Sequence, residues 1–135
     1  LSSSMLLGIA EAVSEMAVSY AKERVQFDRP IGSFQAVQFM LADIKTKIEA
    51  RRALTWKTAW ESDNGIRNTE SAAHAKRFAA DTAMEITTDA VQIFGGYGYT
   101  EEYPVARLMR AAKVMQIYEG TSEIQRLIIG REISR

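Results

Sequence analysis

Glu119 is the residue in this sequence best placed to act as a base. It belongs to the Y-E-G-T segment of residues 118–121, which runs straight into a predicted helix. Ser122 and Gln125 fit the S-x-x-Q capping pattern, so this helix is predicted to begin at Thr121 or Ser122. A carboxylate just outside a capped helix is anchored near free backbone N–H groups, which suits a catalytic base. The same local pattern also suits a solvated loop glutamate.

A glycine-rich segment, residues 95–98, looks like a phosphate-binding loop. It is not the dinucleotide fingerprint, because the G-x-G-x-x-G pattern read from Gly96 places Glu101 where the third glycine should stand, and no strand is predicted before it. Paired glycines let the backbone approach a ligand closely. A helix stop followed by a tight turn would use the same residues, and both interpretations stay open on local grounds.

A third candidate site lies where the first predicted helix ends. Arg24 comes near that end, and Gln26 and Phe27 follow in the next loop. A guanidinium beside an exposed aromatic ring could hold a phosphate and an adenine ring. The more usual alternative is that Arg24 complements the negative end of the helix while Phe27 packs into the core.

Helices must position these candidates, because apolar residues recur at every third or fourth position through most of the chain. In the second of these helices the apolar stripe continues to Trp56 and Trp60, and the third has a face rich in small residues. Only Val114 to Tyr118 resembles a strand. Long helices with short connections predict an all-α fold, an up-and-down four-helix bundle with a short extra helix, in a single domain over residues 1–135. The helices are predicted over residues 5–24, 34–63, 68–94, 104–112 and 122–133.

The composition is that of a globular protein and excludes several functions. The 135 residues contain 17 basic and 17 acidic side chains, so no net charge favours nucleic acid. The absence of cysteine excludes disulfides and thiolate chemistry, and the single His74 cannot form a histidine metal site, so no metal is expected. No apolar run is long enough to span a membrane. Leu1 is not an initiator and no signal peptide follows it, so we expect a piece of a longer protein that is not secreted.

Three segments together resemble the acyl-CoA dehydrogenase family. Arg24 to Ile31 is similar to its R-x-x-F-x-x-P-I motif, Gln92 to Tyr99 to its Q-I-x-G-G-x-G-Y/F motif, and Tyr118 to Gln125 to its Y-E-G-T segment. The motifs occur in the family's order, and the resemblance extends from about Gly8 to the end of the chain. It covers only the C-terminal helical domain of the family, whose N-terminal helical domain and middle β-domain lie outside this sequence.

This resemblance implies an FAD-dependent enzyme that removes hydrogens from the α and β carbons of an acyl-CoA thioester, as in the β-oxidation of fatty acids. Glu119 would take the α-proton. Its own backbone N–H, with a flavin ribityl hydroxyl, would polarise the thioester carbonyl. The β-hydride would pass to the flavin. Tyr118 would line the acyl pocket, and Gly120 would lie beside the substrate.

The resemblance also implies cofactor contacts and partners. In the family, the segment matching Gln92 to Gly96 reaches an FAD held mainly by a neighbouring subunit, so a homo-oligomer, either a dimer or a tetramer, is expected through the helical bundles. Electron-transferring flavoprotein is the expected acceptor. The compartment would be the cytoplasm in a bacterium or the mitochondrial matrix in a eukaryote. The residues expected to contact FAD are Arg24, Gln26, Phe27, Gln35, Gln92, Gly95, Gly96, Thr121 and Glu123.

Three positions depart from the family's usual residues. Asp28 stands where glycine is common, Ala111 where an acidic residue is common, and Glu123 where some members have glutamine. Two other functions stay open, a non-catalytic bundle for oligomerisation or partner binding, and a related acyl-CoA oxidase or flavin monooxygenase. Glutamate at position 119 favours dehydrogenation, because related oxygen-using flavoenzymes often lack it. Without the other domains, we expect the chain to fold but to be inactive.

Overall fold

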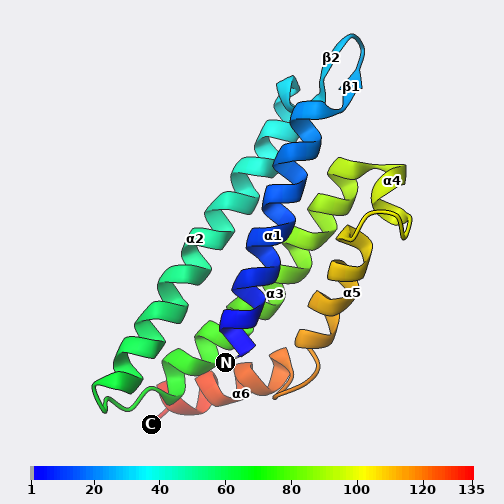
Figure 1. Ribbon diagram of the computed structural model, residues 1–135. Coiled ribbons are helices and arrows are strands. Elements are labelled where there is room, and N and C mark those ends of the chain that lie inside the picture. The colour runs from blue at the N-terminus through cyan, green and yellow to red at the C-terminus, as the bar shows by residue number, and fades with distance from the viewer. Residues whose placement is uncertain (1) are drawn as a thin grey trace.

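The computed structural model describes residues 2–135, which are mostly helical (Figure 1). The long helices α1, α2 and α3 lie alongside one another, α5 packs beside α3, and α6 lies across the end of the bundle near both termini. The predicted all-α bundle is confirmed. In chain order the elements are α1 (Ser2–Glu23), β1 (Val25–Gln26), β2 (Arg29–Pro30), the 3-10 helix η1 (Ile31–Ser33), α2 (Gln35–Asp63), α3 (Thr69–Phe94), α4 (Gly96–Tyr99), α5 (Val105–Met115) and α6 (Ser122–Ile133).

Two details of the predicted secondary structure are wrong. The segment from Val114 to Tyr118 is not a strand, because α5 continues to Met115 and the amides of Ile117 and Tyr118 both donate to the carbonyl of Val114, at 3.0 and 3.1 Å. The segment is therefore the end of a helix and a following turn. The antiparallel pair β1 and β2 was not predicted, since strands of two residues are too short to show an alternating pattern.

The core lies along α3, which contacts α1, α2, α5 and α6. Alanines at positions 79, 80, 83 and 90 are fully or almost fully buried on α3. Such small side chains let neighbouring helices approach, and α1 supplies Val13 and α2 supplies Ile44 and Ile48 to fill the space between them. Within residues 2–135, every helix is too short or too polar to cross a bilayer.

The buried stripe of α2 does not continue to the two tryptophans, so this prediction is wrong. Trp56 and Trp60 are 65% and 60% exposed. At 3.6 residues per turn, eight residues place Trp56 about 80° around the helix from Ile48. Arg51, three residues after Ile48, stays on the buried face and is 1% exposed.

Arg51 carries a buried charge whose desolvation is only partly offset. None of its guanidinium nitrogens has a hydrogen-bond partner among residues 2–135. Burial lowers the pKa of this guanidinium to about 10, although Glu11 acts in the opposite direction. An unpaired charge in an apolar interior opposes folding, since it loses its hydration and gains little in return.

We therefore expect Arg51→Met to raise the free energy of unfolding by about 1–3 kcal/mol, because it keeps an unbranched stem and removes the charge. Thermal unfolding measures the change. Arg52→Met is the matched control, since Arg52 pairs with Glu11 and Glu49 at the surface and its loss should lower stability by about 1 kcal/mol or less. A lower unfolding temperature for Arg51→Met would contradict the prediction.

Candidate active site

Glu119 lies in the base loop, defined here as residues 116–121, which joins α5 to α6. Its side chain is exposed and its backbone has a positive φ of 54°, followed by 86° at Gly120. This left-handed conformation costs a residue with a side chain about 1–3 kcal/mol, so surrounding contacts must hold Glu119 there. No hydrogen bond within residues 2–135 uses the N–H of Glu119. The loop thus presents a carboxylate and a free donor from one residue.

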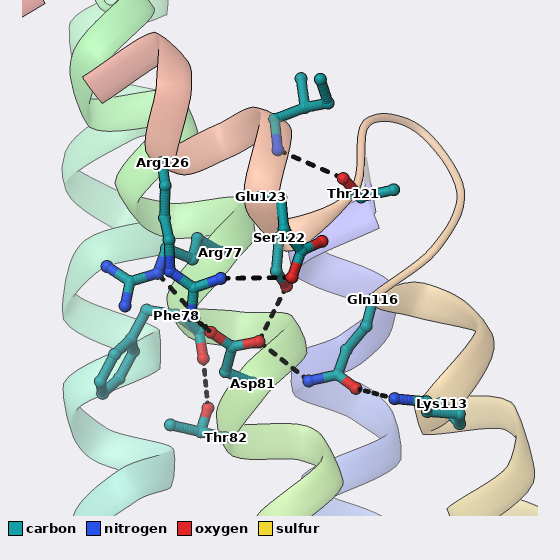
Figure 2. A network of polar contacts seen from close by, with 11 residues as sticks. Arg77, Phe78, Asp81, Thr82, Lys113, Gln116, Thr121, Ser122, Glu123 and Arg126 are labelled. Atoms are coloured by element: carbon teal, nitrogen blue, oxygen red, sulfur yellow. Dashed lines mark hydrogen bonds and ion pairs between the residues drawn. The ribbon is translucent and has the colours of Figure 1, made fainter. Parts of the chain in front are cut away.

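Thr121, rather than Ser122, caps α6, so the predicted capping box is wrong although the predicted helix start is right. Thr121 Oγ1 accepts a hydrogen bond of 3.2 Å from the N–H of Ile124 (Figure 2). The Ser122 hydroxyl instead donates to Asp81 Oδ1 at 2.8 Å, because α3 brings that carboxylate next to it. Gln125 Nε2 donates into the base loop.

Two charged residues of α3 tie the base loop to the bundle. Lys76, which is 6% exposed, donates from Nζ to the carbonyls of Met115 and Gly120 at 2.8 and 2.7 Å. Asp81 Oδ1 accepts from Gln116 Nε2 at 2.9 Å as well as from Ser122 (Figure 2). Sequence analysis missed both residues, because charged residues on a helix are usually solvated and nothing local distinguishes these two.

Four of the predicted cofactor residues line a recess of about 530 Å³ at the opposite end of α3. Arg24 and Gln26 line one side of it, and Gly95 and Gly96 line another. The Arg24 guanidinium carbon lies 5.3 Å from the centre of the Tyr97 ring. The structure therefore brings together two segments that are about 70 residues apart in the sequence.

The glycine-rich segment serves both as a helix stop and as a wall of this recess. Gly95, with a φ of 62°, ends α3 and its N–H donates to the carbonyl of Gln92 at 3.1 Å. A Cβ added at Gly95 or Gly96 would meet no atom within 4 Å, so the surface there is open to a ligand. The helix-stop interpretation is confirmed, and the geometry leaves the ligand interpretation open.

The loop after α1 is shaped by two left-handed residues. Phe27 and Asp28 have φ values of 52° and 59°. Phe27 is 87% exposed, and its ring lies edge-on to that of Phe34 at 6.1 Å between ring centres, so the alternative that it packs into the core is wrong. A positive φ at position 28 explains why glycine suits it, and aspartate is among the residues that tolerate this conformation.

The remaining predicted site residues are exposed or half-buried. Gln35 is the first residue of α2, and Gln92 lies on the exposed side of the end of α3. Glu123, in the first turn of α6, pairs with Arg126 at 3.5 Å, and the hydroxyl of Tyr118 contacts the sulfur of Met115. No group of three or more histidine or acidic side chains in residues 2–135 is placed to hold a metal ion.

The predicted cofactor residues form two separate sets. Gln92 lies 16 residues beyond Lys76 on α3, which corresponds to about 24 Å along the helix at 1.5 Å per residue. One set, around Arg24 and Gly96, lines the recess. The other consists of Thr121, the last residue of the base loop, and Glu123 in the first turn of α6. The predicted cofactor residues of the chain are therefore found toward opposite ends of one helix.

The chain belongs to the acyl-CoA dehydrogenase family. Residues 1–134 match the family model described as "Acyl-CoA dehydrogenase, C-terminal domain". The short-chain specific acyl-CoA dehydrogenase of Megasphaera elsdenii is 57% identical over 129 residues, which cover 96% of this chain and 34% of that protein. The family resemblance inferred from the three motifs is confirmed.

Solved structures agree with this assignment. Butyryl-CoA dehydrogenase from Megasphaera elsdenii matches with a TM-score of 0.97 and 54% identity, covering 99% of this chain and 35% of that one. The FAD complex of PigA matches with a TM-score of 0.94 and 30% identity, covering 98% of this chain and 34% of that one. The chain thus spans about a third of the length of the relatives that it matches.

Proposed function

We propose that this chain is the C-terminal helical domain of an FAD-dependent acyl-CoA dehydrogenase, with Glu119 as the base that removes the α-proton. The observation that carries the proposal is the base loop. Its exposed carboxylate sits on a left-handed backbone that is tied at both ends to α3, and the N–H of the same residue is free. A positioned acceptor of this kind is what proton abstraction beside a carbonyl needs.

In this proposal, one residue performs two tasks. The carboxylate of Glu119 takes the α-proton, and its backbone N–H donates to the thioester oxygen as negative charge develops there. Gly120 lies beside the substrate and leaves room for Gln125, whose Nε2 would lie 2.7 Å from an added Cβ, and Tyr118 forms one side of the acyl pocket. FAD, when bound, supplies the acceptor for the β-hydride.

The recess at the other end of α3 fits part of FAD. Arg24 offers a guanidinium suited to a pyrophosphate, and Gly95 and Gly96 leave room for close approach of a flat ring. The two sets of predicted cofactor residues lie toward opposite ends of α3, and by the family resemblance the set at the recess serves the FAD of a neighbouring subunit. We therefore propose a homo-oligomer in which neighbouring subunits share FAD. The exposed Trp56 and Trp60 are available for such an interface.

The electron acceptor in this proposal is electron-transferring flavoprotein, as in the family. The compartment is the cytoplasm for a bacterial protein and the mitochondrial matrix for a eukaryotic one. Acyl-CoA thioesters are the substrate class, and fatty-acid β-oxidation is the route that uses them.

Anaerobic titration of the flavin absorbance tests the proposal, using the full-length protein that contains this chain and straight, branched and aromatic acyl-CoAs. We expect a protein that purifies with FAD and is bleached by at least one thioester. A protein without flavin that ignores every thioester would instead support a non-catalytic assembly bundle. Rapid reoxidation of the bleached flavin by oxygen would indicate an oxidase or monooxygenase.

A further inference from the structure

We propose that Lys76 and Asp81 are positioning residues, which together hold the base loop so that Glu119 and its N–H face the substrate. The catalytic part of this inference rests on the proposed function. Both residues lie on α3, outside the base loop and distant from it in sequence. Each accepts or donates hydrogen bonds near both ends of the loop, Lys76 at Met115 and Gly120 and Asp81 at Gln116 and Ser122, so the pair closes the loop in two places.

Lys76 supplies the inner closure. Its ammonium lies between the carbonyl of Met115, the last residue of α5, and the carbonyl of Gly120, directly after Glu119. These contacts join residues 39 and 44 positions apart in the sequence. Because a buried ammonium loses its hydration, its only favourable arrangement is one in which both carbonyls stay directed toward it.

Asp81 supplies the outer closure (Figure 2). Its Oδ1 accepts from Gln116, the first residue of the loop, and from Ser122, the first residue of α6. Its other oxygen, Oδ2, faces Arg77 and Arg126 at 3.6 and 3.5 Å. These arginines fix the carboxylate from the side away from the loop.

The backbone at Glu119 requires such closure. Glu119 and Gly120 both have positive φ, a sparsely populated conformation for glutamate that relaxes unless other contacts determine it. Gln125 Nε2 also approaches the carbonyls of Glu119 and Gly120, at 3.5 and 3.3 Å. Relaxation of this backbone would move the carboxylate and the N–H of Glu119 together, since both belong to one residue.

Lys76 also brings a positive charge toward the base. Burial lowers the pKa of its ammonium, whereas Glu119, Asp81 and Glu123 raise it. Glu119 is thus among the acidic groups that act on the ammonium that holds its loop.

The test uses the full-length flavoenzyme. Lys76→Met keeps the length of the stem and removes both hydrogen bonds and the charge. We expect the rate of flavin reduction at saturating acyl-CoA to fall about 100-fold, with little change in acyl-CoA affinity, because a small misplacement of the reacting groups suffices for such a loss. Asp81→Asn should show a smaller fall in the same rate, since the amide oxygen can still accept the two loop hydrogen bonds.

Lys47→Met is the matched control. Lys47 ties α2 to α3 through Glu85 and Asp89, at 2.8 and 3.9 Å, without touching the base loop. Its loss should lower the unfolding temperature while the rate of flavin reduction stays at the wild-type value. An equal loss of rate in Lys47→Met and Lys76→Met would overturn the proposal, because general destabilisation would then explain both.

Two further readouts separate positioning from folding. In Lys76→Met, kcat should fall while the KM for acyl-CoA stays near the wild-type value, and backbone amides of residues 117–121 should exchange hydrogen faster. If this variant does not fold, Lys76→Gln takes its place. It keeps a donor but not the charge, so we expect about a tenfold slower flavin reduction with an unchanged KM for acyl-CoA. A variant with the wild-type rate and wild-type hydrogen exchange would overturn the proposal.

The proposed function can fail separately. If no acyl-CoA reduces the flavin of the wild-type protein, the dehydrogenase assignment is wrong, and the catalytic part of this inference is then also wrong. Hydrogen exchange in residues 117–121 of Lys76→Met and Asp81→Asn then still decides whether these residues hold the loop, because that measurement needs no activity.

Discussion

Glu119→Gln should leave the flavoenzyme unable to bleach its flavin with acyl-CoA at a useful rate, although FAD and acyl-CoA still bind. The amide has the size and shape of the carboxylate, so the base loop keeps its geometry, but it cannot accept the α-proton. We expect the rate of flavin reduction to fall by roughly 10²–10⁴-fold, the range for loss of a general base. Stopped-flow absorbance under anaerobic conditions measures this rate.

Two further variants make this result specific. Glu119→Asp keeps a carboxylate but withdraws it by one methylene, so its rate should lie between those of the wild type and Glu119→Gln. Glu15→Gln removes an exposed carboxylate on α1, and it should retain the wild-type rate. Full activity of Glu119→Gln would exclude Glu119 as the base, whatever the other two variants show.

Gly98→Ala should destabilise the fold, whereas Gly96→Ala should leave it intact and weaken FAD binding. Gly98 is buried, and a Cβ there would lie 2.6 Å from the Cβ of Phe94 and 2.7 Å from the carbonyl oxygen of Val91. Atoms this close to the backbone cannot rotate away. The Phe94 ring stacks on Tyr20 with ring centres 4.1 Å apart, so a shift of Phe94 would spread into the recess.

For Gly98→Ala we expect the free energy of unfolding to drop by about 2–3 kcal/mol, which is a substantial part of the stability of a typical domain. Gly96 has open space around it and stands inside a helical turn, so alanine there should gain up to about 1 kcal/mol. Its methyl group would nevertheless occupy the recess surface proposed for FAD. Thermal unfolding of the apoprotein and the FAD content after purification separate the two effects. Unchanged stability of Gly98→Ala would mean that α3 and α4 can move apart freely.

The family and the helical fold could both be predicted from the sequence, because the information for each is local. An amphipathic helix shows its period within one segment, and each of the three motifs occupies eight consecutive residues. The types of residue in the candidate site follow in the same way. Glu119 next to Gly120, and Arg24 ahead of Phe27, are visible without any knowledge of what lies beside them.

Predictions failed where a residue's role depends on a partner far away in the chain. The S-x-x-Q pattern suggested that Ser122 caps α6, but Asp81 on another helix binds its hydroxyl and Thr121 provides the cap. Trp56 and Trp60 have the correct spacing to each other, yet their rotation from Ile48 carries them to the outside. In the first case the packing of another helix overrode a correct local pattern, whereas in the second the spacing from Ile48 was itself outside the buried face.

By itself, the sequence determined which segments are helical, which family they belong to and which carboxylate stands in the Y-E-G-T segment. Only the tertiary structure decided what holds that carboxylate in place. In the sequence, Lys76 and Asp81 resemble ordinary solvated residues of a helix. In the structure, α3 places them against the base loop, which follows about 40 residues later in the chain. The physical reason is that helix formation depends on neighbours within four residues, whereas burial and hydrogen bonding of a charge depend on whichever segments the fold places around it.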